Sequence, residues 1–151
     1  MDIKSGSGYP ASSLSNFSPH PFEFRGVQVA SMEGLLQSLK FKNPEMQKHV
    51  CTLVGKAAKF KGKDKKWFRD QTLYWDGQPM KRDSQDYQDF LDEAYEALGQ
   101  NASFKKALLA SGDSVLTHSI GKNEETRTVL TTREFCSRLM KLRKKLREET
   151  P

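Results

Sequence analysis

Apolar residues recur at steps of three and four positions between Ser84 and Gly99, and this helical periodicity constrains the fold more than any other feature. The stripe consists of Tyr87, Phe90, Leu91, Ala94, Tyr95 and Leu98. Asp83 or Ser84 can begin the helix and Gly99 suits its end. A helix with one apolar face must pack that face against other elements, so the sequence predicts a globular domain with a helical core.

Four further stripes follow residues that suit helix starts, namely Ser31, Asn43-Pro44, Asn101 and the capping box Thr131–Glu134. Their expected core residues are Met32, Leu35, Leu36 and Leu39; Met46, Val50, Leu53 and Val54; Phe104, Leu108 and Leu109; and Phe135, Leu139, Leu142 and Leu146. Short strands are expected at 22–24 and 27–29 around a Gly turn, at 73–75, and at 114–119. Together these elements predict an α+β fold that is predominantly helical, with short strands.

A chain of 151 residues is one domain's worth, and aromatic residues at 10% are too many for a disordered chain. We expect residues 1–8 to form a flexible N-terminal segment and residues 9–149 to form the domain. Cys51 and Cys136 lack a paired spacing, and the three histidines form no His-x-x-x-His pair, so no metal site and no cofactor are expected.

No apolar run approaches the roughly 18 residues of a membrane span. The N-terminus also lacks the basic and apolar regions of a signal peptide. We therefore expect a cytoplasmic protein with no membrane partner.

Charge is unevenly distributed along the chain. Residues 40–69 hold ten lysines and arginines and two acids, a local net charge of +8, whereas residues 83–96 hold six acids and no base. A concentrated basic stretch favours a phosphate-bearing partner, either nucleic acid or a nucleotide. The alternative is a solvated lysine-rich face that only aids solubility.

Glu33 lies on the helix that follows Ser31 but off its apolar stripe. Glu33, Gln37 and Lys40 recur at steps of four and three and so share a separate polar face. A carboxylate held there could stabilise a cationic transition state or orient water. The alternative is that Glu33 only stabilises the first turn of its helix.

Other polar and aromatic residues suit a nucleotide site. Asn16 and Phe17 could read a base or a ribose from a loop, and Trp75 beside the basic stretch could stack on a base. The loop that contains His118, Ser119 and Gly121 could offer amides and a hydroxyl to a phosphate. Each of these residues would equally serve an ordinary turn or the core.

Three segments occur in an informative order, namely Leu14–Phe22, Ser31–Phe41 and Ala107–Asp113. Together they resemble the NADAR or YbiA-like family over nearly the whole chain, from about Tyr9 to Arg143. The resemblance implies a single YbiA-like domain and N-glycosidase activity. Members are associated with hydrolysis of early riboflavin-pathway intermediates or with removal of ADP-ribose from guanine bases in nucleic acid.

The resemblance places Glu33 at the acid of the family's Ser-x-Glu motif and Asn16 at the Asn of its N-terminal loop. Asp83-Ser84 stands where better-known members have Asp-Trp, and His118–Lys122 stands where they have an Asp followed by Trp-Gly. This chain therefore looks like a divergent branch, in which Tyr87 or Trp75 would supply the stacking ring and His118 a polar role. Lys40 and Arg82 would suit the phosphates of the substrate.

The main hypothesis is a metal-free hydrolase with Glu33 as its catalytic carboxylate. Its substrate would be a small phosphorylated ribosyl or ADP-ribosyl compound, or ADP-ribosylated nucleic acid. The alternative is a non-catalytic module that binds ADP-ribose or another nucleotide. A third hypothesis is a nucleic-acid-binding protein that uses the basic stretch. Within that stretch, we expect Lys40 to reach a substrate phosphate, and the lysines between Lys56 and Lys66 to lie on an outer face.

Overall fold

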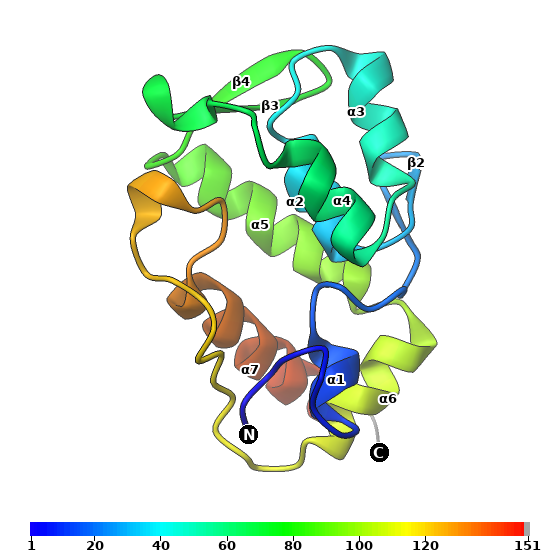
Figure 1. Ribbon diagram of the computed structural model, residues 1–151. Helices are drawn as coiled ribbons and strands as arrows, with labels where there is room; N and C mark the ends of the chain where they lie inside the picture. Colours follow the sequence, from blue (N-terminus) through cyan, green and yellow to red (C-terminus); the bar gives the residue numbers. More distant parts are fainter. Residues whose placement is uncertain (150–151) are drawn as a thin grey trace.

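The structure, a computed structural model, describes residues 1–149 and forms one α+β domain that is rich in helices (Figure 1). Its helices are α1 (Ala11–Leu14), α2 (Met32–Ser38), α3 (Pro44–Cys51), α4 (Gly55–Gly62), α5 (Gln85–Leu98), α6 (Ala102–Ala110) and α7 (Thr132–Glu149). Its strands are β1 (Phe22–Phe24), β2 (Val27–Val29), β3 (Thr72–Trp75) and β4 (Gln78–Lys81), and two short 3-10 turns are η1 (Trp67–Arg69) and η2 (Glu125–Arg127). The predicted fold class is confirmed.

Helices begin where the sequence predicted caps. The side chains of Ser31, Ser84 and Asn101 accept hydrogen bonds from backbone N–H groups in the first turns of α2, α5 and α6. At α7, the Glu134 N–H donates to the Thr131 hydroxyl over 3.1 Å, and the Thr131 N–H donates to the Glu134 carboxylate over 2.8 Å. This reciprocal pair is the predicted capping box, and it satisfies two N–H groups that the helix itself leaves unpaired.

The strands form two antiparallel hairpins, β1–β2 and β3–β4. Their turns, Arg25-Gly26 and Asp76-Gly77, have positive φ angles of 48°, 81°, 48° and 80°. Two consecutive left-handed residues match the right-handed twist of a two-residue hairpin, and glycine adopts this backbone without strain. The β1–β2 hairpin and strand β3 were predicted from the sequence, whereas β4 was not. The strand expected at 114–119 is reduced to a single bridge between Asp2 and Thr117.

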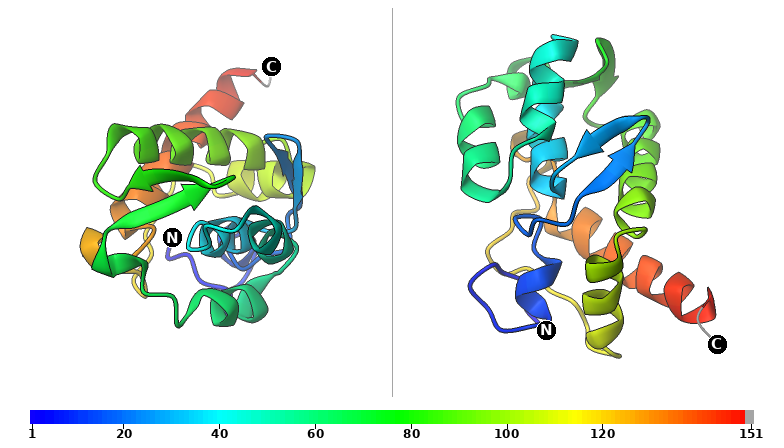
Figure 2. Two further views of the ribbon diagram at one scale, coloured as in Figure 1. Left: turned by 90° about the horizontal axis from the view of Figure 1, so that it is seen from above. Right: turned by 90° about the vertical axis from the view of Figure 1, so that its right-hand side faces the viewer.

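Helix α2 lies at the centre of the domain. Figures 1 and 2 place α4 and α5 on opposite sides of it, and α3 also packs against it. The predicted stripe of Met32, Leu35, Leu36 and Leu39 is almost completely buried. The sequence therefore identified the core face of this helix correctly.

Gly34 allows α2 to approach the end of α3 closely. A Cβ atom at this position would lie 2.5 Å from the Leu53 carbonyl oxygen and 3.1 Å from that of Val50. The Ser31 hydroxyl donates to the Leu53 carbonyl across the same contact, over 3.0 Å. The missing side chain thus sets the distance between α2 and the chain that follows α3.

Three local expectations differ from the structure. Helix α1 occupies part of the predicted N-terminal loop, and α4 occupies part of the basic stretch that was not predicted to be helical. On α3 the polar Gln47 is buried and Met46 is exposed. Gln47 is buried because its side chain is fully paired: its amide donates to the Ser38 and Tyr74 carbonyls and its oxygen accepts from the Asp76 N–H.

The N-terminal residues, expected to be a flexible segment outside the domain, contribute to its core. Ile3 is completely buried, and its N–H donates to the Thr117 carbonyl over 2.8 Å. The Thr117 N–H donates in turn to the Met1 carbonyl. The sequence shows no strand pattern here because the pairing is a single bridge.

Within residues 1–149, no helix combines the length and the apolar character needed to cross a membrane.

The Gly34 contact predicts that Gly34→Ala destabilises the protein. Overpacking of this kind costs about 1–3 kcal/mol, although alanine is the better helix former. Urea denaturation should show a lower unfolding free energy. The control Gly8→Ala, where nothing lies within 4 Å of the added carbon, should change stability by less than about 0.5 kcal/mol. Equal stability of the two variants would contradict the importance of the contact.

Candidate active site

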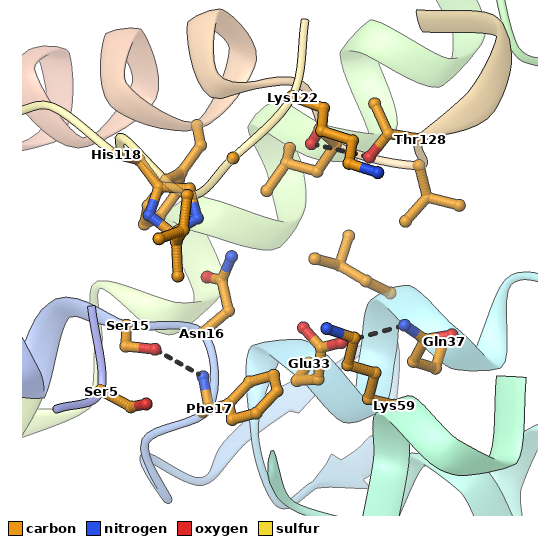
Figure 3. A pocket seen from close by; sticks show the side chains of 16 residues that line it. Ser5, Ser15, Asn16, Phe17, Glu33, Gln37, Lys59, His118, Lys122 and Thr128 are labelled. Carbon is orange, nitrogen blue, oxygen red and sulfur yellow. Dashed lines mark hydrogen bonds between the residues drawn. The ribbon is translucent and has the colours of Figure 1, made fainter. Parts of the chain in front are cut away.

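A cavity of about 270 Å³ opens beside the first turn of α2 (Figure 3). Its walls come from the loop after α1, from α2 and α4, and from the long connection between α6 and α7. The sixteen lining residues are Ser5, Ser15, Asn16, Phe17, Glu33, Leu36, Gln37, Lys59, His118, Ile120, Gly121, Lys122, Thr128, Val129, Leu130 and Phe135. Segments that are distant in the sequence therefore converge on one hollow.

Glu33 is the one carboxylate among these sixteen residues. It is half-buried, and its backbone N–H donates to the Asn16 carbonyl over 3.0 Å, which ties the loop after α1 to the start of α2. Its carboxylate accepts a hydrogen bond of 2.9 Å from the Gln37 amide, one turn further along α2. The second carboxylate oxygen, Oε2, is thus the one left to face a ligand.

The surroundings of Glu33 change its acidity. Burial raises the pKa of the Glu33 carboxyl above its ordinary value. The Gln37 hydrogen bond and the positive charges of Lys40, Lys59 and His118 oppose this rise. A desolvated carboxylate among cations interacts strongly with any positive charge that develops nearby, because water screens it weakly.

Asn16 is oriented by a tyrosine of the core. The Tyr95 hydroxyl donates to Asn16 Oδ1 over 2.9 Å, which leaves the Nδ2 amide group as a donor toward the cavity (Figure 3). Tyr95 is buried, and this burial raises the pKa of its hydroxyl well above the ordinary value. The hydroxyl therefore keeps its proton and holds the amide in one orientation.

His118 is held by the N-terminal segment. Its Nδ1 lies 2.7 Å from the Ile3 carbonyl oxygen, and because a carbonyl can only accept, Nδ1 carries the hydrogen. Nε2 is therefore free to accept or donate a proton. The ring also packs edge-on against Phe135, with 5.3 Å between centroids.

Two lysines bring positive charge to the cavity, Lys59 from α4 and Lys122 from the α6–α7 connection. In Figure 3 the Lys59 side chain extends toward Glu33. Its ammonium group also lies 6.0 Å from the centroid of the Phe17 ring. A cation, an aromatic ring and a carboxylate thus share one side of the cavity.

The structure brings together six residues that the sequence singled out. Asn16, Phe17, Glu33, Gln37, His118 and Gly121 all line the cavity. Gly121 packs closely against its neighbours, since a Cβ atom there would lie 2.3 Å from Thr132 Oγ1 and 2.5 Å from the His118 ring. Their common location makes this cavity the candidate active site.

Three other predicted site residues lie outside its lining. Lys40 is half-buried, and its ammonium group donates to the Gly62 carbonyl over 3.3 Å, so it joins α2 to α4 rather than reaching the opening. Ser119 donates through its N–H and its hydroxyl to the Asp2 carboxylate. Asp83 is exposed in the turn before α5. None of the three is placed to contact a ligand in this cavity.

Trp75, Arg82 and Tyr87 are also corrected, because all three belong to the packing of the domain. Trp75 stacks edge-on against Phe24, with 5.1 Å between centroids, and borders a different hollow near the two hairpin turns. Arg82 and Tyr87 are completely buried. The expected substrate contacts are therefore unavailable to these side chains.

Arg82 and Tyr87 instead hold the wall of the cavity from behind. Arg82 forms a buried ion pair of 2.6 Å with Glu134 and donates to the Thr128 carbonyl over 2.9 Å. The Tyr87 hydroxyl donates to the Val129 carbonyl over 2.5 Å. Thr128 and Val129 line the cavity, so two residues expected to bind substrate act on the backbone that shapes the site.

Lys59 and Lys122 line the cavity although the sequence did not predict them there. Lys59 was grouped with the lysines of an outer face because α4 was not recognised as a helix. The buried positions Gly55, Ala58 and Gly62 define the packed side of α4, and Lys59 stands at the edge of that side. The spacing of these small residues was the available signal, whereas nothing in the sequence pointed to Lys122.

Comparisons with known proteins agree with the fold. The chain matches the family described as bacteriophage protein GP30.3 over residues 8–144. It is 39% identical over 149 residues to an uncharacterised 17.1 kDa protein from the Gp30–rIII intergenic region of Enterobacteria phage T4, covering 97% of this chain and 98% of that one. The NMR structure of the E. coli protein YbiA is similar in fold, with a TM-score of 0.65 and 19% identity over 99% of this chain and 85% of YbiA.

The raised pKa of the Glu33 carboxyl predicts an effect of Glu33→Gln on stability. The carboxyl has its ordinary pKa when unfolded and a raised pKa when folded, so its ionisation favours the unfolded state. Glu33→Gln should therefore increase the unfolding free energy at pH 7. The gain should shrink as the pH falls through the raised pKa and vanish below the ordinary pKa.

The matched control is Glu45→Gln. Glu45 is an exposed acid in the first turn of α3, where it interacts favourably with the helix dipole. Its replacement should lower stability slightly at pH 7. Thermal denaturation of both variants between pH 3 and pH 8 checks the prediction, and a loss of stability in Glu33→Gln at neutral pH would contradict it.

Proposed function

The chain belongs to the bacteriophage GP30.3 family, and from its YbiA-type fold and the cavity around Glu33 we propose that it is an N-glycosidase. The substrate is a ribosylated or ADP-ribosylated nucleobase-type compound, either a riboflavin-pathway intermediate or an ADP-ribosylated guanine in nucleic acid. The bond that breaks joins the anomeric carbon of the ribose to a nitrogen of the base.

The observation that carries this proposal is the half-buried Glu33 carboxylate at the wall of a cavity that also offers amide donors and cations. Cleavage of an N-glycosidic bond passes through a state in which the ribose carries positive charge. A carboxylate with a raised pKa, held by Gln37 and shielded from water, stabilises that charge. It can also accept a proton from the attacking water.

In this reaction, the electron pair of the broken bond leaves with the nitrogen of the base. The oxygen of water bonds to the anomeric carbon, and the proton that water loses passes to Glu33 and from there to solvent. His118 Nε2 is available to donate a proton to the departing base when the imidazole is charged. The chain's own groups thus account for every proton and electron pair.

The remaining lining residues suit the parts of such a substrate. The Phe17 ring offers a stacking face to the base, and the Asn16 amide offers a donor to a hydroxyl or carbonyl. Lys59 and Lys122 offer positive charge to a phosphate on the ribose. The cavity volume of about 270 Å³ lies just below the roughly 300–1,000 Å³ of small-molecule sites, which suits one nucleoside-sized portion of the substrate.

One observation favours the alternative of a non-catalytic module that binds ADP-ribose or another nucleotide. Glycosidases commonly use two carboxylates, whereas Glu33 is the one carboxylate among the lining residues. A site that lacks the second acid could bind the same ligand without cleaving it. Binding and turnover must therefore be measured separately.

The catalytic role of Glu33 predicts that Glu33→Gln lowers turnover by at least about 100-fold, the loss typical of removing an electrostatic stabiliser. The protein is incubated with ADP-ribosylated DNA and with the phosphorylated riboflavin intermediate. The ADP-ribose released from the first substrate and the sugar phosphate released from the second are measured by chromatography and mass spectrometry. The control Glu45→Gln should retain wild-type turnover.

Three results would decide between the hypotheses. Turnover by wild type that Glu33→Gln abolishes supports the hydrolase. Binding of free ADP-ribose by wild type, measured by calorimetry, without hydrolysis of either substrate supports the binding module. Wild-type turnover in Glu33→Gln removes Glu33 from the mechanism.

A further inference from the structure

Within residues 1–149, several basic residues around α5 and α7 pair with acids, whereas the lysines of α4 and of the loop that follows it do not. Around α5 and α7 the ion pairs are Arg25–Glu93, Arg138–Asp92, Lys145–Glu96 and Arg147–Asp113. By contrast, none of the six lysines between Lys56 and Lys66 forms an ion pair with any residue from 1 to 149. The charge of α4 and the loop that follows it is thus left for an external partner.

The exposed face of α4 also presents an aromatic ring. The helix packs through its small residues Gly55, Ala58 and Gly62, and Phe60 lies on the opposite side with 74% of its surface exposed. Lys56 precedes Phe60 by about one turn and Lys63 follows it by about one turn, so both flank the ring. A large apolar side chain in the middle of a charged face gains nothing from the core.

Helix α5, by contrast, is rich in acidic residues. Helix α5 and the turn before it carry six acids between Asp83 and Glu96. Figures 1 and 2 show α5 and α4 on opposite sides of α2. This separation directs a polyanion to α4 and away from α5, because the field of the whole protein acts on the approaching partner.

We propose that the exposed face of α4 binds single-stranded nucleic acid, with Phe60 stacked on a base and Lys56, Lys61 and Lys63 in contact with phosphates. A positively charged surface with an accessible aromatic ring is the combination that binds single strands without sequence preference. Paired bases in a duplex do not offer a free face to the ring. The partner is therefore a single strand.

The surface adjoins the mouth of the cavity. Lys59 belongs to α4 and also lines the cavity. A strand that lies along α4 thus passes the opening beside Glu33. The surface itself is defined by binding alone, so it stands or fails independently of any hydrolysis in the cavity.

The electrostatic part is tested with a fluorescent oligothymidine of about 20 nucleotides, longer than the ~4–16 nucleotides that one such site covers. The dissociation constant of the whole protein is measured by anisotropy at several salt concentrations. The triple variant Lys56→Gln, Lys61→Gln and Lys63→Gln should bind more weakly. A plot of the logarithm of the association constant against the logarithm of salt concentration should become less steep by about 2, since each phosphate contact contributes about 0.7 to the slope.

The matched control removes three exposed lysines elsewhere, with Lys106→Gln, Lys141→Gln and Lys144→Gln. It has the same net charge as the α4 variant and should bind nearly as tightly as wild type. Equal weakening in the two triple variants would show that only net charge matters and would overturn the proposed surface.

The stacking part is tested at Phe60. Phe60→Ala should weaken binding to the oligothymidine about tenfold, the loss expected for one stacked base, whereas Phe60→Trp should retain it. A duplex of equal length should bind more weakly than the single strand and should not respond to Phe60→Ala. Unchanged binding in Phe60→Ala, or equal binding of duplex and single strand, would overturn the proposed stacking of Phe60 on a base.

Preferential binding to anionic phospholipid vesicles, lost in the same variants, would assign the α4 surface to a membrane and would overturn the proposal of a nucleic-acid partner.

Discussion

The close approach of α2 to the end of α3 is the contact on which the rest of the molecule depends. It exists because Gly34 has no side chain, and the Ser31 hydroxyl spans the same contact. Gly62 plays a similar part on the other side, where a Cβ atom would lie 2.0 Å from Gln37 Oε1. Enclosed in this way, α2 has one half-buried polar position in its first turn, Glu33, and the cavity forms around it.

Several polar residues that resemble ligand contacts turn out to support the site from within. A buried charge or hydroxyl is costly unless it is paired. Arg82 and Glu134 pair with each other, Arg82 also donates to the Thr128 carbonyl, and the Tyr87 hydroxyl donates to the Val129 carbonyl. Burial opposes ionisation of Glu134, but the hydrogen bonds from Arg82 and Gln88 outweigh it and hold the pKa of this carboxyl below its ordinary value. The pair therefore stays charged and keeps one wall of the cavity in place. The N-terminal segment does the same for His118 through the Ile3 carbonyl.

The two proposals concern adjacent parts of the same side of the domain. The cavity offers a desolvated carboxylate for chemistry on one ribose, and the α4 surface offers unpaired lysines and an exposed ring for a longer strand. Lys59 connects them, since it is part of the helix and of the cavity lining. The acids of α5 lie on the far side of α2, so the distribution of charge favours approach of an anionic partner from the α4 side (Figure 2).

The amino-acid sequence by itself determined most helix starts, the apolar stripes, the β1–β2 hairpin, strand β3 and the polar position of Glu33, because caps, periodicity and turn residues act over three or four neighbouring positions. Asn16 and Phe17 were also singled out from the sequence, and the resemblance placed Asn16 at the Asn of the family's N-terminal loop. The tertiary structure alone decided that Arg82 and Tyr87 are buried, that Trp75 packs against Phe24 away from the cavity, that Lys59 reaches the cavity and that the N-terminus holds His118. Each of these outcomes depends on contacts between residues far apart in the chain, such as Arg82 with Glu134 and Ile3 with His118. Local patterns carry no information about such partners. In the sequence, a polar side chain that is buried and paired therefore looks the same as one that binds a ligand, and only the packing distinguishes the two.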